Sequence, residues 1–270
     1  MFTKIVAPIL PFFTQMRCFS TVMPVVFKYV KHPKLDSRFV VRQIIPTEIE
    51  EIAEGIAEVY FNRENVVRTL HLPRNDFKQR LVDDLKESQA NDLAIVCWDE
   101  KSNKFAGALY CQDLRLLIDK LSLNKEEEDE NWMQYDDFAK TCFTHIDQYA
   151  MPKGTHDVLY CKRIAVSRDY SQLAIGDNIM HVARFLHPKM TKYHRNIIIA
   201  THEYTYNFCR LNGFEVIKKI AYKSIRDRNN KKPFEKMKKL NNRTEADEYV
   251  YVMKRECEGS SYFQEIKKHK

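Results

Sequence analysis

Glycine is scarce in this chain, with only six in 270 residues, so a glycine at a turn or a close packing contact carries information. The seven cysteines contain no Cys-x-x-Cys spacing. An odd, unpatterned set argues against a disulfide framework and against structural zinc, and it fits a reducing compartment. No stretch has the about 20 consecutive apolar residues that a transmembrane helix needs, so we expect no membrane-spanning segment.

Acidic residues are absent from the first 35 positions, which hold five lysines and arginines. Residues 1–23 (MFTKIVAPILPFFTQMRCFSTVM) are rich in apolar and hydroxyl side chains, a composition typical of a mitochondrial presequence. Arg17 lies two residues before an expected cleavage point. Pro8 and Pro11 interrupt the apolar core that a secretory signal would need. We therefore expect import into the mitochondrial matrix.

The remaining chain is nearly neutral, although the net charge of the whole is +7. Five of the 44 basic residues lie in residues 1–35, which leaves 39 against 37 acidic ones. Global charge therefore gives no support for nucleic-acid binding. Lysines gather locally at 231–239, where either a solvated face or a site for an acidic lipid, phosphate or partner surface would explain them.

A change in composition divides the chain after the first segment. Residues 24–37 contain Pro24 and Pro33 with little periodicity, which predicts a linker. Residues 38–255 alternate β-branched runs with amphipathic stretches and predict one α/β domain. Residues 256–270 are expected to form a basic tail, and no internal repeat is visible.

The periodicity of the domain predicts seven strands and five helices. Thr47 is a plausible N-cap, with Glu50 completing a capping box, and the acidic stretch 124–137 is expected to be an exposed helix end or loop. Strands are predicted at 39–45, 93–98, 104–111, 157–166, 196–201, 214–222 and 246–254, and helices at 49–60, 74–89, 138–151, 177–187 and 203–211.

Two stretches in this order resemble the GCN5-related N-acetyltransferase (GNAT) superfamily. Residues 164–176 (IAVSRDYSQLAIG) resemble the family's central strand and acyl-CoA pyrophosphate loop. Residues 208–214 (FCRLNGF) resemble its closing Y-x-K-x-G-F element. The resemblance covers about residues 38–255. It implies the GNAT fold, of class α/β (α+β), with a mixed, mostly antiparallel central sheet flanked by helices.

The N-terminal part of the domain points to one branch of that superfamily. Residues 58–66 (EVYFNRENV) are similar to the F-x-x-E-P-L segment of arylalkylamine N-acetyltransferases. Tyr222, Lys223 and Ser224, with the later Phe234, are similar to that branch as well.

The resemblance implies a site for acetyl-CoA, since a turn that feeds a helix N-terminus offers free N–H groups to a pyrophosphate. Gly176 is retained. Gln172 and Ala174 replace two earlier glycines, and Ser171 replaces the usual basic residue. Alanine at 174 costs little if its φ is negative. The implied cofactor-binding residues are Ile164, Ala165, Val166, Ser171, Gln172, Leu173, Ala174, Ile175 and Gly176.

The resemblance also implies the catalytic groups of direct acyl transfer, which needs a base for the amine and an acid for the departing thiolate. Glu64 corresponds to the base, and Cys209 occupies the position of the usual tyrosine acid. Tyr206 lies nearby, and the hydroxyls of Thr201 and Thr205 fall one helical turn apart. The histidines are not spaced as ligands, so we expect no metal site and no nucleophile triad.

These features leave three functional hypotheses. The first is an acetyl-CoA-dependent N-acetyltransferase that acts on a small amine in mitochondria. The second is a catalytically degenerate GNAT-fold subunit of a mitochondrial complex, in the respiratory chain or the ribosome. The changed loop, the missing tyrosine, the acidic insert and the basic tail favour this hypothesis. The third is a protein or tRNA acetyltransferase, which would want a basic groove.

Overall fold

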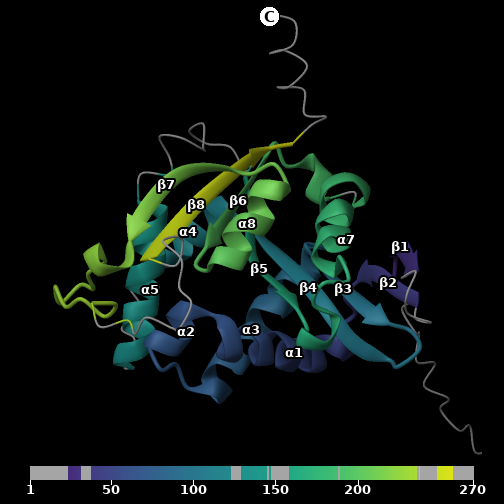
Figure 1. The fold of residues 1–270 in the computed structure, drawn as a ribbon, viewed down its shortest axis with the longest axis horizontal. Helices are drawn as coiled ribbons and strands as arrows, with labels where there is room; N and C mark the ends of the chain where they lie inside the picture. The colour runs from purple at the N-terminus through teal and green to yellow at the C-terminus, as the bar shows by residue number, and fades with distance from the viewer. Residues whose placement is uncertain are drawn as a thin grey trace, which may run out of the picture.

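The computed structural model describes residues 24–31, 38–122, 129–144, 146, 158–187, 189–235, 237 and 248–257. Within them lies one eight-stranded sheet of order β1-β2-β3-β4-β5-β6-β8-β7, shown in Figure 1. All neighbours are antiparallel except β5 and β6, which run parallel. The strands are β1 (Val26–Lys31), β2 (Arg38–Gln43), β3 (Ala94–Asp99), β4 (Lys104–Asp113), β5 (Val158–Val166), β6 (Arg195–Ala200), β7 (Glu215–Ala221) and β8 (Tyr249–Glu256).

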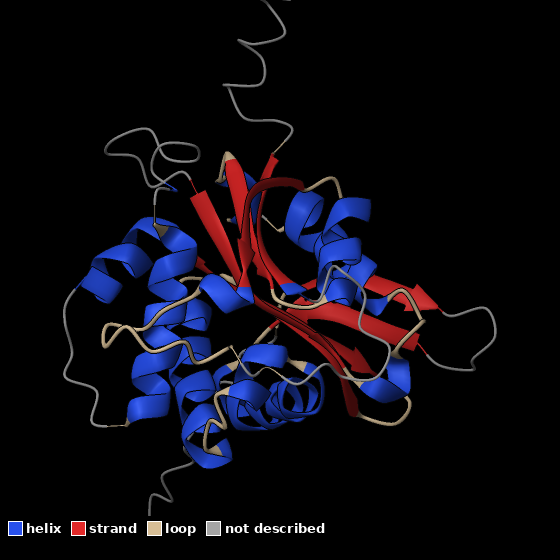
Figure 2. Ribbon diagram, turned by 60° about the vertical axis from the view of Figure 1, so that its left-hand side comes forward, coloured by secondary structure: helices blue, strands red, loops and turns tan. Residues whose placement is uncertain are grey.

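Helices cover both faces of this sheet, as Figure 2 shows. One face packs on α1 (Ile49–Arg63), α3 (Arg74–Ala90), α4 (Leu114–Ser122) and α5 (Glu130–Phe143). The opposite face packs on α7 (Ile175–His181) and α8 (Glu203–Leu211). The short α2 (Asn65–Thr69) follows α1 directly, and a π-helical turn, Val182–Leu186, continues α7.

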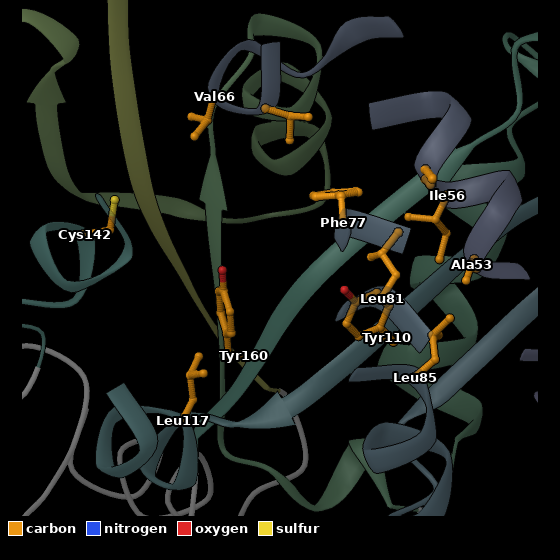
Figure 3. Packing of buried hydrophobic residues seen from close by; sticks show 14 of the residues in the cluster. Ala53, Ile56, Val66, Phe77, Leu81, Leu85, Tyr110, Leu117, Cys142 and Tyr160 are labelled. Atoms are coloured by element: carbon orange, nitrogen blue, oxygen red, sulfur yellow. The ribbon is translucent and has the colours of Figure 1, made fainter. Parts of the chain in front are cut away.

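Alternation along the central strands supplies a core to each face, because successive side chains of a strand point to opposite sides. Val96 and Ala108 belong to the α1/α3 side, whereas Cys97 and Leu109 belong to the α7/α8 side. Figure 3 shows the first core, in which Phe77 and Leu81 of α3 approach Tyr110 of β4. The predicted fold class, a mostly antiparallel sheet between helices, is confirmed.

Four local expectations differ from the structure. The stretch expected to be a linker contains β1, which pairs antiparallel with β2. The sequence pattern did not predict this strand, because its side chains are only partly buried. Thr47 caps no helix, since Pro46 starts a 3₁₀ turn and Glu48 takes the N-cap position. Sequence periodicity also missed α4.

The fourth difference lies in the acidic stretch, of which the structure describes residues 129–137: they form the N-cap and first half of α5. The carboxylate of Asp129 accepts from the backbone N–H groups of Asn131 and Trp132, at 2.8 and 3.1 Å. Trp132 is buried against Phe77. The helix expected at 138–151 is therefore the second half of α5, and residues 147–151 lie outside the described part, as do the expected presequence 1–23 and the tail beyond Cys257.

A β-bulge in β5 decides where the sheet opens. On β4, Tyr110 pairs with Arg163 and its neighbour Cys111 pairs with Cys161, so Lys162 is the extra residue of β5. The recorded pairing of β5 with β6 ends at Cys161 and Ile198. A bulge bends its strand, and the two parallel strands diverge beyond this point.

Candidate active site

The divergence of β5 and β6 creates a cleft of about 200 Å³. Beyond Cys161, the backbone of β5 no longer pairs with β6 and presents its polar groups to this space. Ile164 and Val166 of β5 line one wall, as predicted for a strand that receives an extended ligand. Ala165 points its side chain to the opposite face and is buried there; its backbone alone can contribute.

Glu64 lies where α1 ends and α2 begins, and it lines the cleft. One carboxylate oxygen, Oε2, accepts from the backbone N–H of Val67 at 2.6 Å and caps α2. The other, Oε1, is buried without a hydrogen-bond partner. A buried acceptor with no donor is costly unless a ligand or water supplies one, so Oε1 is a candidate acceptor for a substrate proton.

The facing wall comes from the end of β6 and the start of α8. Thr201 and Thr205 both line the cleft, and His202 caps α8 through its Nδ1, which accepts from the Tyr204 N–H at 3.2 Å. The Thr201 carbonyl accepts from Asn65 Nδ2 at 3.1 Å. This bond ties the wall that carries the threonines to the helix that Glu64 caps, so the two sides of the cleft are held together.

The 171–176 loop reaches the cleft through its last residue. Gly176 lines it, and a Cβ there would lie 3.2 Å from Phe208 and 3.6 Å from Val166. Gln172 and Ala174 have φ of 77° and 54°, the left-handed region that glycine adopts at no cost. Alanine at 174 would cost little only at a negative φ, and its φ is positive. The loop nevertheless keeps the backbone shape that glycines would give.

The other loop residues serve the fold of the turn. Ser171 Oγ donates to the Arg168 carbonyl at 2.8 Å, and Ile175, the first residue of α7, is buried. Leu173 packs against the core on the α7/α8 side. The first backbone N–H groups of a helix have no acceptor within the helix, and in α7 no side chain caps them.

Two predicted catalytic residues do not lie in the cleft. Cys209 is fully buried in the core beneath α8, and burial raises the pKa of its thiol. Tyr206 stacks on Tyr251 of β8, with ring centroids 4.2 Å apart. Both side chains pack from α8 onto the sheet. The residues of this helix that line the cleft are instead Tyr204, Thr205 and Phe208. Cys209 is therefore no candidate proton donor.

Several cleft residues have no counterpart among the predicted ones. Tyr60 and Arg63 of α1 line it, as does Lys162 at the bulge, whose ammonium lies 2.7 Å from Asp84. The Tyr60 hydroxyl donates to the Ile164 carbonyl at 3.5 Å, and burial raises the pKa of Tyr60 to about 12. Helical spacing placed Tyr60 on α1, but only the approach of α1 to β5 in the folded structure shows that Tyr60 lines the cleft and contacts the Ile164 carbonyl.

No protein-family model and no curated protein matches this chain in sequence. Solved structures match it in fold. The C-terminal condensation domain of Ebony, in complex with beta-alanyl-dopamine, matches with a TM-score of 0.63 and 15% identity over 81% of this chain and 98% of that one. Mosquito arylalkylamine N-acetyltransferase like 5b matches with a TM-score of 0.61 and 14% identity, over 81% and 99%.

A Drosophila melanogaster polyamine N-acetyltransferase matches equally broadly, with a TM-score of 0.62 and 14% identity over 81% of this chain and 99% of that one. The chain therefore has the GNAT fold. Structures of the arylalkylamine N-acetyltransferase branch are among its fold neighbours, as the sequence resemblance predicted. At this identity the likeness concerns the fold, and the chemistry has to be argued from the cleft.

The described residues contain no group of three or more histidine, cysteine, aspartate or glutamate side chains placed to hold a metal ion. Among the helices that the structure describes, none combines the length and the apolar character needed to cross a bilayer.

Proposed function

We propose that this protein is an acetyl-CoA-dependent N-acetyltransferase that acts on a small amine in the mitochondrial matrix. The observation that carries the proposal is the cleft between β5 and β6. It is lined by the part of β5 that no longer pairs with β6 and by Glu64, whose Oε1 is buried without a hydrogen-bond partner. The fold neighbours named as acetyltransferases of arylalkylamines and polyamines support an amine as acceptor. The acid-free residues 1–23 support the matrix.

The cleft fits the thioester arm of acetyl-CoA. An extended amide chain can pair with the open edge of β5 as a further strand would. Gly176 leaves room beside Phe208, which a Cβ would fill. At about 200 Å³ the cleft is smaller than the roughly 300–1,000 Å³ of drug-sized pockets. It therefore takes the acetyl and pantetheine groups, and the nucleotide lies outside, toward the 171–176 loop.

The reaction needs one proton removed and one returned. The amine nitrogen attacks the thioester carbonyl carbon, a C–N bond forms, and the C–S bond breaks. Glu64 Oε1 accepts the amine proton, directly or through a water. Tyr204 lines the cleft from α8 and replaces Cys209 as the candidate donor of a proton to the thiolate. Each group is reached from a different wall, so acceptor and donor do not compete.

Thermal unfolding of residues 24–270, with and without millimolar acetyl-CoA, tests this proposal. The fragment keeps β1, which the sheet needs. Ligand at a hundred times its dissociation constant adds about 2.7 kcal/mol to the folded state, and each kcal/mol moves the midpoint by roughly 2–4 °C in a domain of this size. We expect a rise of several degrees, followed by release of free CoA when an amine is added.

A catalytically degenerate subunit of a mitochondrial complex is the second candidate. The replacement of loop glycines by Gln172 and Ala174, which are strained at their positive φ, and the burial of Cys209 at the position of the family's tyrosine acid favour it. An unchanged midpoint at millimolar acetyl-CoA, together with no CoA release, would reject the enzyme and leave this alternative. A capture experiment from mitochondria would then identify the complex.

A further inference from the structure

A second pocket, of about 380 Å³, lies beside the cleft on the α1/α3 side of the sheet. Its walls come from α3, α5 and the bulged part of β5. Phe77, Trp132 and Tyr135 line part of it, although Phe77 and Trp132 are only 1% and 4% exposed. Most of the remaining lining is charged: Arg80, Asp83, Asp84, Asp136, Lys162 and Arg163. Lys162 lines both this pocket and the cleft, so the two spaces are neighbours across a single side chain.

Arg163 lines this pocket and is 9% exposed. Its guanidinium lies 4.8 Å from the ring centre of Tyr60 and 5.1 Å from that of Phe77, and Nη2 donates to the Tyr135 hydroxyl. Its Nε is buried without a partner. Aromatic faces stabilise a buried cation by about 0.5–2 kcal/mol each, which offsets only part of the cost of desolvating a guanidinium.

No carboxylate among the described residues pairs with Arg163, although three line the same pocket. Asp84 is held by Lys162 at 2.7 Å, and Asp136 lies 3.8 Å from Arg80. Asp83 is exposed at the rim, where it accepts from Gln79 at 3.3 Å. The local anions are thus engaged elsewhere or exposed to solvent, and the buried cation lacks a counter-ion.

The position of Arg163 relates this cation to the proposed reaction. Its guanidinium stacks on Tyr60, and Tyr60 lines the cleft that Glu64 also lines. Both Tyr60 and Glu64 come from the α1/α2 side, whereas the loop proposed for the nucleotide lies on the α7 side. A ligand that reaches Arg163 from the cleft therefore approaches on the acceptor's side.

We propose that Arg163 binds a carboxylate of the acceptor, so that the substrate is a primary amine that also carries a carboxylate and an aromatic body, an aromatic amino acid. This inference rests on the proposed acetyltransfer. A carboxylate would supply the missing counter-ion, and the planar guanidinium can bind it with two parallel hydrogen bonds. An arylalkylamine would leave the guanidinium unpaired. Arg80 already lies over the Trp132 ring, 3.7 Å from its centre, so the aromatic ring of the substrate would contact only those parts of Phe77, Trp132 and Tyr135 that line the pocket.

Matched pairs of amines test this specificity. Tyrosine and tyramine differ only in the carboxylate, as do phenylalanine and phenethylamine. A charge-assisted hydrogen bond contributes about 1.5–3 kcal/mol, so we expect kcat/KM for each amino acid to exceed that of its amine by about tenfold or more. In Arg163→Met the ratio should fall to about one, and Arg163→Lys should restore part of it. Arg115→Met, an exposed arginine on α4, should keep the wild-type ratio.

A binding measurement separates this inference from the proposed function. The chain has two tryptophans, and Trp132 lines the pocket, so a Trp98→Phe background reports on the pocket by fluorescence. We expect saturable quenching by tyrosine but weaker binding of tyramine, and loss of this difference in Arg163→Met, with circular dichroism confirming the fold. The same binding difference is expected even if no acetyl-CoA binds. That combination would reject the proposed acetyltransferase activity and retain the carboxylate site at Arg163. Equal binding of the pair, or no quenching by tyrosine, overturns the inference, as does a wild-type preference for tyramine.

Discussion

The two carboxylate oxygens of Glu64 have different roles. Oε2 caps α2, and Oε1 is buried without a partner in a residue that lines the cleft. Substitution by glutamine retains an oxygen that can accept from the Val67 N–H but removes the proton acceptor. The side chain therefore offers a variant that separates chemistry from folding.

We expect Glu64→Gln to lower kcat by about 100-fold or more, in line with the contribution of a general base, while the dissociation constant of acetyl-CoA changes little. Steady-state kinetics and calorimetry measure the two quantities. Glu58→Gln, an exposed position on the same helix, serves as the control and should retain wild-type turnover. Retained turnover in Glu64→Gln would remove this residue from the mechanism.

Ala174 shows the cost of losing a glycine. Its φ of 54° is disfavoured for a residue with a Cβ by about 1–2 kcal/mol, and the greater freedom of glycine in the unfolded chain offsets about 0.4–1 kcal/mol of that. We expect Ala174→Gly to raise the free energy of unfolding by up to about 1 kcal/mol in urea. Ala139→Gly, inside α5, should lower it by about that amount. A loss of stability in Ala174→Gly would show that the loop is not strained.

At the scale of elements, the cleft depends on how closely α7 and α8 approach β5. Gly176 is the point of contact, since a Cβ there would meet Phe208 at 3.2 Å and Val166 at 3.6 Å. A larger side chain can remain in the helix only by occupying the cleft or displacing Phe208, which itself lines the cleft.

We expect Gly176→Val to weaken acetyl-CoA binding by more than tenfold, a loss of about 1.4 kcal/mol or more, with the fold retained. Calorimetry measures the affinity, and circular dichroism checks the fold. Wild-type affinity in this variant would place the thioester arm elsewhere.

At the scale of the whole molecule, stability should depend on pH through a buried histidine. His187 is 2% exposed, and its Nδ1 accepts from the backbone N–H groups of Lys189 and Met190 at 3.3 and 3.4 Å. Burial lowers the pKa of His187 below its ordinary value. The folded state therefore resists a proton that the unfolded chain accepts near its usual pKa of about 6.5.

The unfolding free energy should be fully retained above about pH 6.5 and should fall as the pH drops below it, because the unfolded state then binds more protons. Urea titrations between pH 7.5 and 5.5 measure this slope. His187→Gln should reduce the slope, although His181, whose pKa is also lowered by burial, leaves part of it. The low pKa of Asp137, which pairs with Arg228, acts only in a more acidic range. An unchanged slope in the variant would contradict this assignment.

The sequence by itself determined most of the elements and the direction of the functional argument. Apolar runs and helical spacing placed seven of the strands and α1, α3 and α8 close to their observed limits, because these segments bury one face each. The family-like stretches pointed to Glu64, Thr201, Thr205 and Gly176, which the structure brings together. β1 was missed, since a half-exposed edge strand carries only a weak periodic signal. The helix α4 was missed as well, although Leu114 and Leu117 recur in it at helical spacing and are buried.

Only the tertiary structure decided which side chains meet. The bulge at Lys162 opens the sheet, and it is visible in the register of two strands far apart in the chain. The rotation of α8 about its axis turns Cys209 into the core and Tyr204 toward the cleft, which spacing alone does not fix. The guanidinium of Arg163 is enclosed by Tyr60, whose ring it covers, and by Tyr135, whose hydroxyl accepts its hydrogen bond, and these two residues lie on separate helices. Such contacts depend on packing between distant segments, and local sequence patterns do not encode them.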